Sequence, residues 1–270
     1  MPTSALGLAL AAAVIHALWN VLLARARDVQ AATAVALIVA EVVSLPLTIA
    51  VWRVDRAVIP FLIAGGALQL LYFVLLARGY RLAELTVVYP IARGTAPVIV
   101  LLIGALALGR SSSARQVLGV ILVAAGVLLV RGARRGPGVP YGLLIACTIA
   151  GYTLVDKSGV RHAGAIPYLE LEMLVPAVLY ATAVARGKGI GALRNAWGWQ
   201  SVVAGIASFG AYGLVLLALQ RAPAAPVAAV RETSVVIAAL LARRLLHEAV
   251  GLPRIAGSVA VAGGIVLLSI

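Results

Sequence analysis

Two arginines stand inside long apolar stretches of this sequence, where charged side chains are rare. Arg93 follows Tyr89 at helical spacing within residues 86–108, and Arg231 opens the run Arg-Glu-Thr-Ser within residues 225–246. A guanidinium group is always charged, and it binds a carboxylate or a phosphate through two parallel hydrogen bonds. Two such groups near the centre of a membrane are suited to hold the anionic group of a substrate.

Acidic side chains in other apolar stretches give a competing interpretation of these arginines. A buried charge without a partner costs far more free energy than a paired one. We therefore expect Arg93 to pair with Glu41. Arg231 would pair with Glu172, while the adjacent Glu232 contacts another helix. Structural pairing and substrate binding both stay open, because an ion pair that opens when a ligand binds also serves as a gate.

The first apolar stretch, residues 4–24, carries a polar face. His16, Trp19 and Asn20 are three and four residues apart, so they share one side of a helix. Imidazole gains or loses a proton near neutral pH, and the amide offers both donors and an acceptor. One interpretation is a wall of a substrate cavity, with His16 carrying a proton. The other is hydrogen bonding between helices, with Trp19 packed in the core.

Tyrosines occupy corresponding segments in the two halves of the chain, Tyr72 in the first and Tyr212 in the second. Tyr152 lies four residues before Asp156, so these two share a helical face. A tyrosine brings a large apolar ring and one hydroxyl into a pocket, which suits amphipathic metabolites. We predict that Tyr72, Tyr89, Tyr152 and Tyr212 line a cavity. For Tyr152 and Asp156 the alternative is a polar belt at the membrane surface.

The composition identifies the solvent of these segments. The chain of 270 residues is 63% hydrophobic and 11% charged, against about half and a quarter in soluble domains. A soluble domain could not bury so much apolar surface, so the lipid bilayer must be a partner. The net charge of +13 suggests nucleic acid, but 20 of the 22 basic residues flank apolar blocks, as membrane anchors do. We therefore expect no nucleic-acid partner.

The apolar blocks predict an all-α membrane protein of about ten transmembrane helices. Spanning a bilayer takes roughly 17 to 25 apolar residues in a helix. Strands are disfavoured because the blocks lack alternation, and lipid requires every backbone group to be paired within its segment. The predicted spans are residues 4–24, 31–52, 57–78, 86–108, 115–131, 140–157, 165–185, 199–219, 225–246 and 252–269.

A shift of 138 positions superposes the ends of the two halves. Several distinctive residues coincide, namely Arg93 with Arg231, Thr95 with Thr233, Gly119 with Gly257 and Gly126 with Gly264. Each half then holds five spans, so the second half enters the membrane upside down, which is an inverted repeat as in alternating-access carriers. The predicted organisation is a first repeat over residues 1–132, a linker over 133–139 and a second repeat over 140–270.

Three stretches resemble one family: "HALWN" from residue 16, "GYRLAELTVVYPIARGTAP" from residue 79 and "GSVAVAGGIVLLSI" from residue 257. The chain resembles the EamA-like, ten-helix branch of the drug/metabolite transporter superfamily. The resemblance implies a central cavity. It also implies that residues 115–131 and 252–269 pack at the periphery, or between subunits of a homodimer. The sequence departs from the family at Arg110, where a glutamate is common, although Glu248 keeps it in the second half.

The predicted function is secondary transport of a small-molecule substrate. We expect export of small polar or amphipathic metabolites, amino-acid-like or drug-like, by alternating access. The sequence has no ATP-binding motif and no catalytic or metal-binding motif, so we expect no enzyme activity, no cofactor and no metal. A flippase for lipids or lipid-linked sugars is the alternative within the same fold.

The orientation in the membrane has two conflicting indications. Connectors after the odd-numbered spans carry 13 basic residues and those after the even-numbered spans carry seven. The positive-inside rule then places both termini outside. The family resemblance implies that both termini are cytoplasmic, and we follow it for a multi-pass protein of the plasma (inner) membrane.

Overall fold

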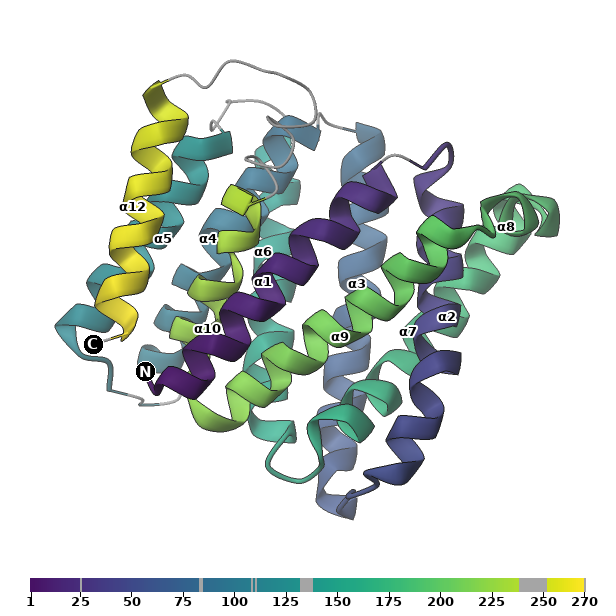
Figure 1. The fold of residues 1–270 in the computed structure, drawn as a ribbon, viewed down its shortest axis with the longest axis horizontal. Coiled ribbons are helices and arrows are strands. Elements are labelled where there is room, and N and C mark those ends of the chain that lie inside the picture. The colour runs from purple at the N-terminus through teal and green to yellow at the C-terminus, as the bar shows by residue number, and fades with distance from the viewer. Residues whose placement is uncertain are drawn as a thin grey trace.

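The computed structural model of the protein describes residues 1–24, 26–82, 85–107, 109, 111–131, 138–237 and 252–269. Within these residues the chain is helical, and extended pairing is confined to one isolated bridge between Val54 and Ala163. The predicted all-α fold is therefore confirmed. Figure 1 shows the helices packed side by side, with α1 and α9 crossing diagonally over the others.

Each predicted span contains a helix, and most of the predicted bounds agree with the structure within a few residues. Two short helices at connectors, η1 and α8, were not predicted. The described helices are α1 (Thr3–Ala24), α2 (Val29–Ala50), η1 (Arg56–Val58), α3 (Ile59–Leu82), α4 (Leu85–Leu106), α5 (Ala114–Arg131), α6 (Gly138–Gly159), α7 (Ala165–Lys188), α8 (Ile190–Ala196), α9 (Trp199–Arg221), α10 (Ala224–Arg231) and α12 (Leu252–Ser269).

The helices have the length and the outer surface of membrane spans. Among the described residues, six helices are long and apolar enough to cross a bilayer, and three apolar stretches in α4, α5 and α12 are shorter. Large apolar side chains such as Val42, Ile63 and Val259 are about two-thirds exposed. In water such a surface would drive aggregation, whereas in lipid it is the favoured exterior. The protein is a multi-pass membrane protein.

Helices α5 and α12, which correspond under the 138-residue shift, pack against each other (Figure 1). Gly264 lies so close to Gly119 that a Cβ on Gly264 would stand 2.7 Å from the Gly119 carbonyl oxygen. Similarly, a Cβ on Gly126 would stand 2.6 Å from the Gly257 carbonyl oxygen. Each contact is the image of the other under the 138-residue shift, so the two helices run antiparallel and the repeat is inverted.

The family resemblance implied that the segments carrying these glycines, residues 115–131 and 252–269, pack at the periphery or between subunits. The structure uses them for packing inside one chain, where they let the backbones of α5 and α12 approach. The two chain ends meet nearby, since the Met1 ammonium group donates to the Leu268 carbonyl at 2.6 Å. Both termini therefore lie at the same end of the helix bundle.

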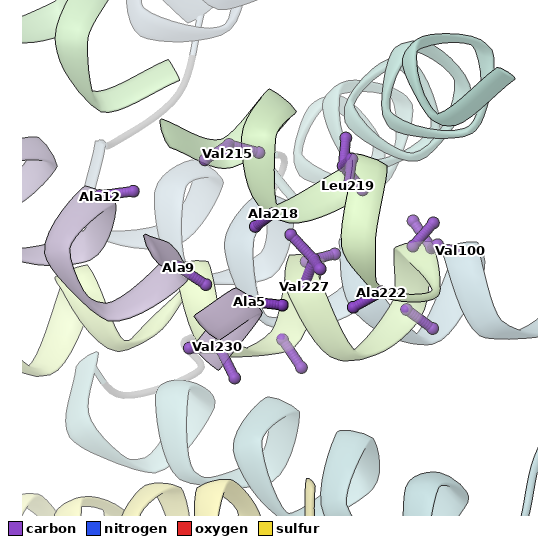
Figure 2. Close-up of a cluster of buried hydrophobic side chains, with 14 of the residues drawn as sticks. Ala5, Ala9, Ala12, Val100, Val215, Ala218, Leu219, Ala222, Val227 and Val230 are labelled. Atoms are coloured by element: carbon purple, nitrogen blue, oxygen red, sulfur yellow. The ribbon is translucent and has the colours of Figure 1, made fainter. Parts of the chain in front are cut away.

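A stripe of alanines fixes the position of α1. Ala5, Ala9 and Ala12 are buried where α1 meets α9 and α10, facing residues such as Val215 and Val227 (Figure 2). Small side chains at helical spacing let α1 cross these helices at short range. His16 is the next position of this stripe, so the packing that holds α1 also turns His16 inward.

Candidate functional site

Arg93 of α4 and Arg231 of α10 meet on one carboxylate, that of Glu232. Arg93 Nη1 lies 3.3 and 3.4 Å from the two carboxylate oxygens. Arg231 Nη2 and Nε lie 3.3 and 3.4 Å from Oε1. The side chains of Arg93, Arg231 and Glu232 are 6%, 3% and 1% exposed, so the cluster is dry. Packing of α10 on α4 brings the two repeat-related arginines together.

This shared partner replaces the two predicted ion pairs. Arg93 was expected to pair with Glu41 and Arg231 with Glu172, but the structure gives both arginines to Glu232. The reason is the position of the helices, because α2 and α7 pack against each other while α4 and α10 form a separate contact. The expectation that Glu232 contacts another helix holds for its contact with Arg93.

The regular helix is distorted at Glu232, whose backbone stays in the right-handed helical region. Helix α10 ends at Arg231, the Glu232 N–H bonds back to the Ala228 and Ala229 carbonyls, and helical structure resumes over residues 233–237. The sequence predicted one uninterrupted helix across this point. The following Thr233 and Ser234 hydroxyls are buried and have no hydrogen-bond partner in the described part of the chain. These two hydroxyls follow directly after Arg231 and Glu232 in the chain.

His16 joins the cluster through Arg93. Its Nε2 lies 2.7 Å from Arg93 Nη2. An arginine side chain has only donors, so the imidazole must accept here and its single proton must lie on Nδ1. A second proton would break this hydrogen bond and set two positive charges side by side. In this conformation His16 is therefore a neutral partner of Arg93, which weighs against the proposed proton carrier.

Trp19 and Asn20 lie on the same face of α1 as His16, but their side chains contact other groups than the arginines. Trp19 packs edge-on to His16 at 4.8 Å between ring centroids, and it borders a buried cluster of α1, α2 and α9. Asn20 donates to the His16 carbonyl of its own helix at 2.7 Å. Trp19 thus supports the His16 ring, and the Asn20 amide group is already engaged. The structure brings His16 to the arginines, but not the other two side chains.

Three of the predicted tyrosines form an aromatic wall beside Arg231. The ring centroids of Tyr72 and Tyr152 are 6.2 Å apart, and those of Tyr152 and Tyr212 are 6.0 Å apart. The Arg231 guanidinium carbon lies 5.9 Å from the Tyr152 ring centre and 6.0 Å from that of Tyr212. At this separation a cation is attracted to the faces of the rings. Tyr152 is buried, so it does not belong to a surface belt.

Asp156 is a site residue that the sequence left undecided. It lies near the end of α6, yet its side chain is fully buried. The Tyr168 hydroxyl donates to Oδ1 at 3.1 Å, and the Tyr212 hydroxyl donates to Oδ2. Glu172 of α7 is also buried on this side, against Gly65 of α3. The site thus has a second, acidic end, which Tyr212 joins to the arginine cluster.

Glu41 lies apart from both ends of the site. It is buried on α2 and its Oε2 has no hydrogen-bond partner among the described residues. One turn further along α2, Ser44 donates to Glu170 of α7 at 2.5 Å, and Thr48 reaches the same oxygen at 3.3 Å. Glu41 therefore belongs to the contact between α2 and α7.

Some predicted residues cannot be placed in this geometry. Tyr89 lies in α4, but its side chain is outside the described residues, as are Arg110 and Glu248. The remaining site residues form an elongated constellation in the dry interior. Its positive end comprises Arg93 and Arg231, its negative end comprises Asp156 and Glu172, and tyrosine rings lie between them. Such an arrangement offers charged groups of both signs and the faces of aromatic rings to a polar molecule.

Comparison with known proteins gives a family and a fold. Residues 3–132 and residues 136–270 each match the model of the EamA-like transporter family. No curated protein sequence matches the chain. A solved structure titled only "Crystal structure of protein" is similar, with 18% sequence identity and a TM-score of 0.78, over 99% of this chain and 96% of that one. At this identity the likeness establishes the fold alone.

Proposed function

Because the chain belongs to the EamA-like transporter family, we propose that it is a secondary carrier for small amino-acid-like metabolites. Such solutes carry a carboxylate and an ammonium group on a compact apolar body. The two charged ends of the site and the tyrosines between them match these three features. No ATP-binding motif occurs in the sequence, so the driving force is a solute gradient, exchange or protons.

The observation that carries the proposal is the pairing of Arg93 and Arg231 at the break after α10. One carboxylate, that of Glu232, lies between two guanidinium groups, so this end holds one positive charge in excess. The Thr233 and Ser234 hydroxyls beside it offer donors that no described group accepts. A solute carboxylate would supply the missing negative charge and accept from these hydroxyls.

The inverted repeat supports alternating access as the mechanism. In carriers with inverted repeats, the binding site lies where the halves meet, on helices that are interrupted at mid-membrane. Arg231 and Glu232 stand at such an interruption, and Arg93 comes from the other half. Rocking of one half against the other would expose this site to each side in turn. We propose export as the direction.

A thermal-shift screen of the purified protein tests the proposal. Amino acids, organic acids, polyamines and phospholipids would each be added to the wild type and to two variants. A ligand at a hundredfold excess over its Kd stabilises the folded state by about 2.7 kcal/mol. Thr233→Val removes a hydroxyl that has no hydrogen-bond partner among the described residues, so the variant should still fold. Loss of one hydrogen bond to a charged ligand, about 1.5–3 kcal/mol, should weaken binding roughly ten- to hundredfold.

Thr153→Val is the matched control, because Thr153 is equally buried but its hydroxyl bonds the Ile149 carbonyl of its own helix at 2.7 Å. We expect an amino acid to stabilise the wild type and Thr153→Val equally, and Thr233→Val by only about 0.4–1.4 kcal/mol. Equal stabilisation of all three proteins would show that the Thr233 hydroxyl does not contact the ligand. Uptake of the labelled amino acid into liposomes preloaded with the same compound would then test carrier activity.

One feature favours the flippase alternative. A cavity of about 530 Å³ lies where α4, α6 and α9 end, and Lys157, Arg161 and Arg221 line it. Basic pockets between helix ends bind the headgroups of anionic lipids. Stabilisation by phospholipids alone, lost when Arg161 and Arg221 are both changed to Gln, would support lipid transport in place of metabolite transport.

The membrane arrangement completes the proposal. We propose a plasma-membrane location with both termini cytoplasmic, and a homodimer through the outer faces of α5 and α12. A cysteine in place of Ser112, in a chain with Cys147→Ala, should react with an impermeant maleimide only when the cytoplasmic face is accessible. The mass of the detergent-solubilised protein by light scattering tests the dimer.

A further inference from the structure

Two buried carboxyl groups, Asp156 of α6 and Glu172 of α7, form the acidic end of the site. Asp156 is fully buried and Glu172 is 1% exposed. Both side chains lie near the Tyr168 hydroxyl, and neither oxygen of Glu172 has a hydrogen-bond partner among the described residues. An ionised carboxylate without donors in a dry interior is strongly unfavourable. One of the two groups therefore needs a proton.

Helix α3 makes the room that this pair occupies. A Cβ at Gly65 would stand only 2.2 Å from Glu172 Oε1 and 3.4 Å from the Tyr168 hydroxyl. The glycine thus leaves space for the Glu172 carboxyl group but contributes no donor to it. Helix α2 also packs on α7, but its Ser44 and Thr48 hydroxyls meet Glu170 rather than Glu172.

The hydrogen-bond donors that the structure describes around the pair both donate to Asp156. Tyr168 of α7 and Tyr212 of α9 each have one hydroxyl proton, and both protons are donated to Asp156. The Arg231 guanidinium carbon lies 6.0 Å from the ring centre of Tyr212, which is one of these two donors. Asp156 is therefore equipped to be the ionised partner, whereas Glu172 must supply its own proton.

The charges of the whole site lead to the same result. Its described ionised groups are two guanidinium groups, Arg93 and Arg231, and three carboxyl groups, Glu232, Asp156 and Glu172. With all of them ionised, the buried site would hold one uncompensated negative charge. Such a charge destabilises the folded state by on the order of several kcal/mol. One proton makes the site neutral. His16 cannot take this proton here, because its Nε2 accepts from Arg93.

We propose that Asp156 and Glu172 form a proton-binding site, in which Glu172 carries one proton and donates it towards Asp156. Asp156 lies three residues before the end of α6, about 4.5 Å along the helix axis, so the route to the end of the bundle is short. Its use in transport rests on the proposed function. Loss of the proton would change the charge that faces Arg231 and Tyr212, and so couple protons to solute binding.

Infrared spectroscopy of the purified protein tests this site without a substrate. A protonated carboxylic acid has a carbonyl stretch well separated from that of a carboxylate, and it shifts in D₂O. Spectra at neutral pH, in a detergent without ester groups, would be recorded for the wild type, Glu172→Gln, Asp156→Asn and Glu170→Gln. Glu170 is the matched control, since it is buried on the same helix but accepts from Ser44 and Thr48.

We expect the wild type to exceed Glu172→Gln by the band of one carboxylic acid per chain, and Glu170→Gln to keep that band. Asp156→Asn should lose it too, because the new amide and the two freed tyrosine hydroxyls can then donate to an ionised Glu172, and two cations face two carboxylates. Retention of the full band in Asp156→Asn would show that Glu172 is protonated without Asp156, which contradicts a proton-binding site formed by the two groups together. Absence of any such band in the wild type overturns the proposal without a variant. A failed ligand screen would leave these results unaffected.

Discussion

Neighbouring glycines in α12 should respond to the same substitution with opposite signs. In Gly264→Ala the new Cβ would lie 2.7 Å from the Gly119 carbonyl oxygen and from Val123 Cγ2. Ordinary contact begins at 3.4 Å, so α5 and α12 would have to part by about 0.7 Å. Overpacking of this kind costs about 1–3 kcal/mol. In Gly263→Ala the Cβ meets nothing within 4 Å, and only the gain in helix propensity remains, about 0.5–1 kcal/mol.

Both variants receive that gain in helix propensity, so the difference between them isolates the helix contact. We expect Gly264→Ala to unfold at a lower temperature than the wild type and Gly263→Ala at an equal or slightly higher one, in the same detergent. Gly126→Ala repeats the experiment in the other half, where the Cβ would lie 2.6 Å from the Gly257 carbonyl oxygen. If Gly264→Ala proved as stable as Gly263→Ala, the close contact between α5 and α12 would be refuted.

The remaining predictions concern two ion-paired carboxylates, those of Glu232 and Asp28. Glu232→Gln at neutral pH should destabilise the fold by about 3–5 kcal/mol, because it leaves two buried guanidinium groups without their carboxylate. Lys188→Met should cost only about 0.2–1 kcal/mol, because the side chains of Lys188 and Asp28 are 35% and 36% exposed. This holds although their distance, 2.8 Å, is shorter than those in the arginine cluster. Equal losses of stability for the two variants in a denaturing-detergent titration would contradict this ranking. The hydrogen bond from Lys188 lowers the pKa of Asp28 from its ordinary 3.8. The pair therefore contributes fully above that value and is lost as the pH falls through the lower folded-state pKa, so the stability gap between wild type and Lys188→Met should close in acid.

The sequence was sufficient for the helices and for the two arginines. Apolar length and the absence of alternation determine a membrane helix almost without tertiary information. Superposing the halves singled out Arg93 and Arg231 before any contact between α4 and α10 was known. The glycine pairs of α5 and α12 came from the same shift. Repetition thus supplied long-range information that periodicity alone cannot give.

The partners of the buried charges could not be read in the same way. Asp156 lies near the end of α6, and a position along the helix axis suggests exposure at the membrane surface. Its burial is lateral, because Tyr168 from α7 and Tyr212 from α9 cover it. Arg93 likewise meets Glu232 because of the way α10 packs on α4. Such contacts depend on the packing of helices far apart in sequence, which hydropathy does not encode.

The two halves of the chain differ at the position of Glu232. The 138-residue shift places Gly94 of α4 on Glu232, and α4 continues through Gly94 without interruption. There a Cβ would lie 2.8 Å from the Leu128 side chain of α5, so that position has no room for a side chain. The corresponding place in the second half carries a glutamate. Helix α10 ends beside it, and its carboxylate lies between Arg93 and Arg231, so the two halves differ at the point where the proposed solute would bind.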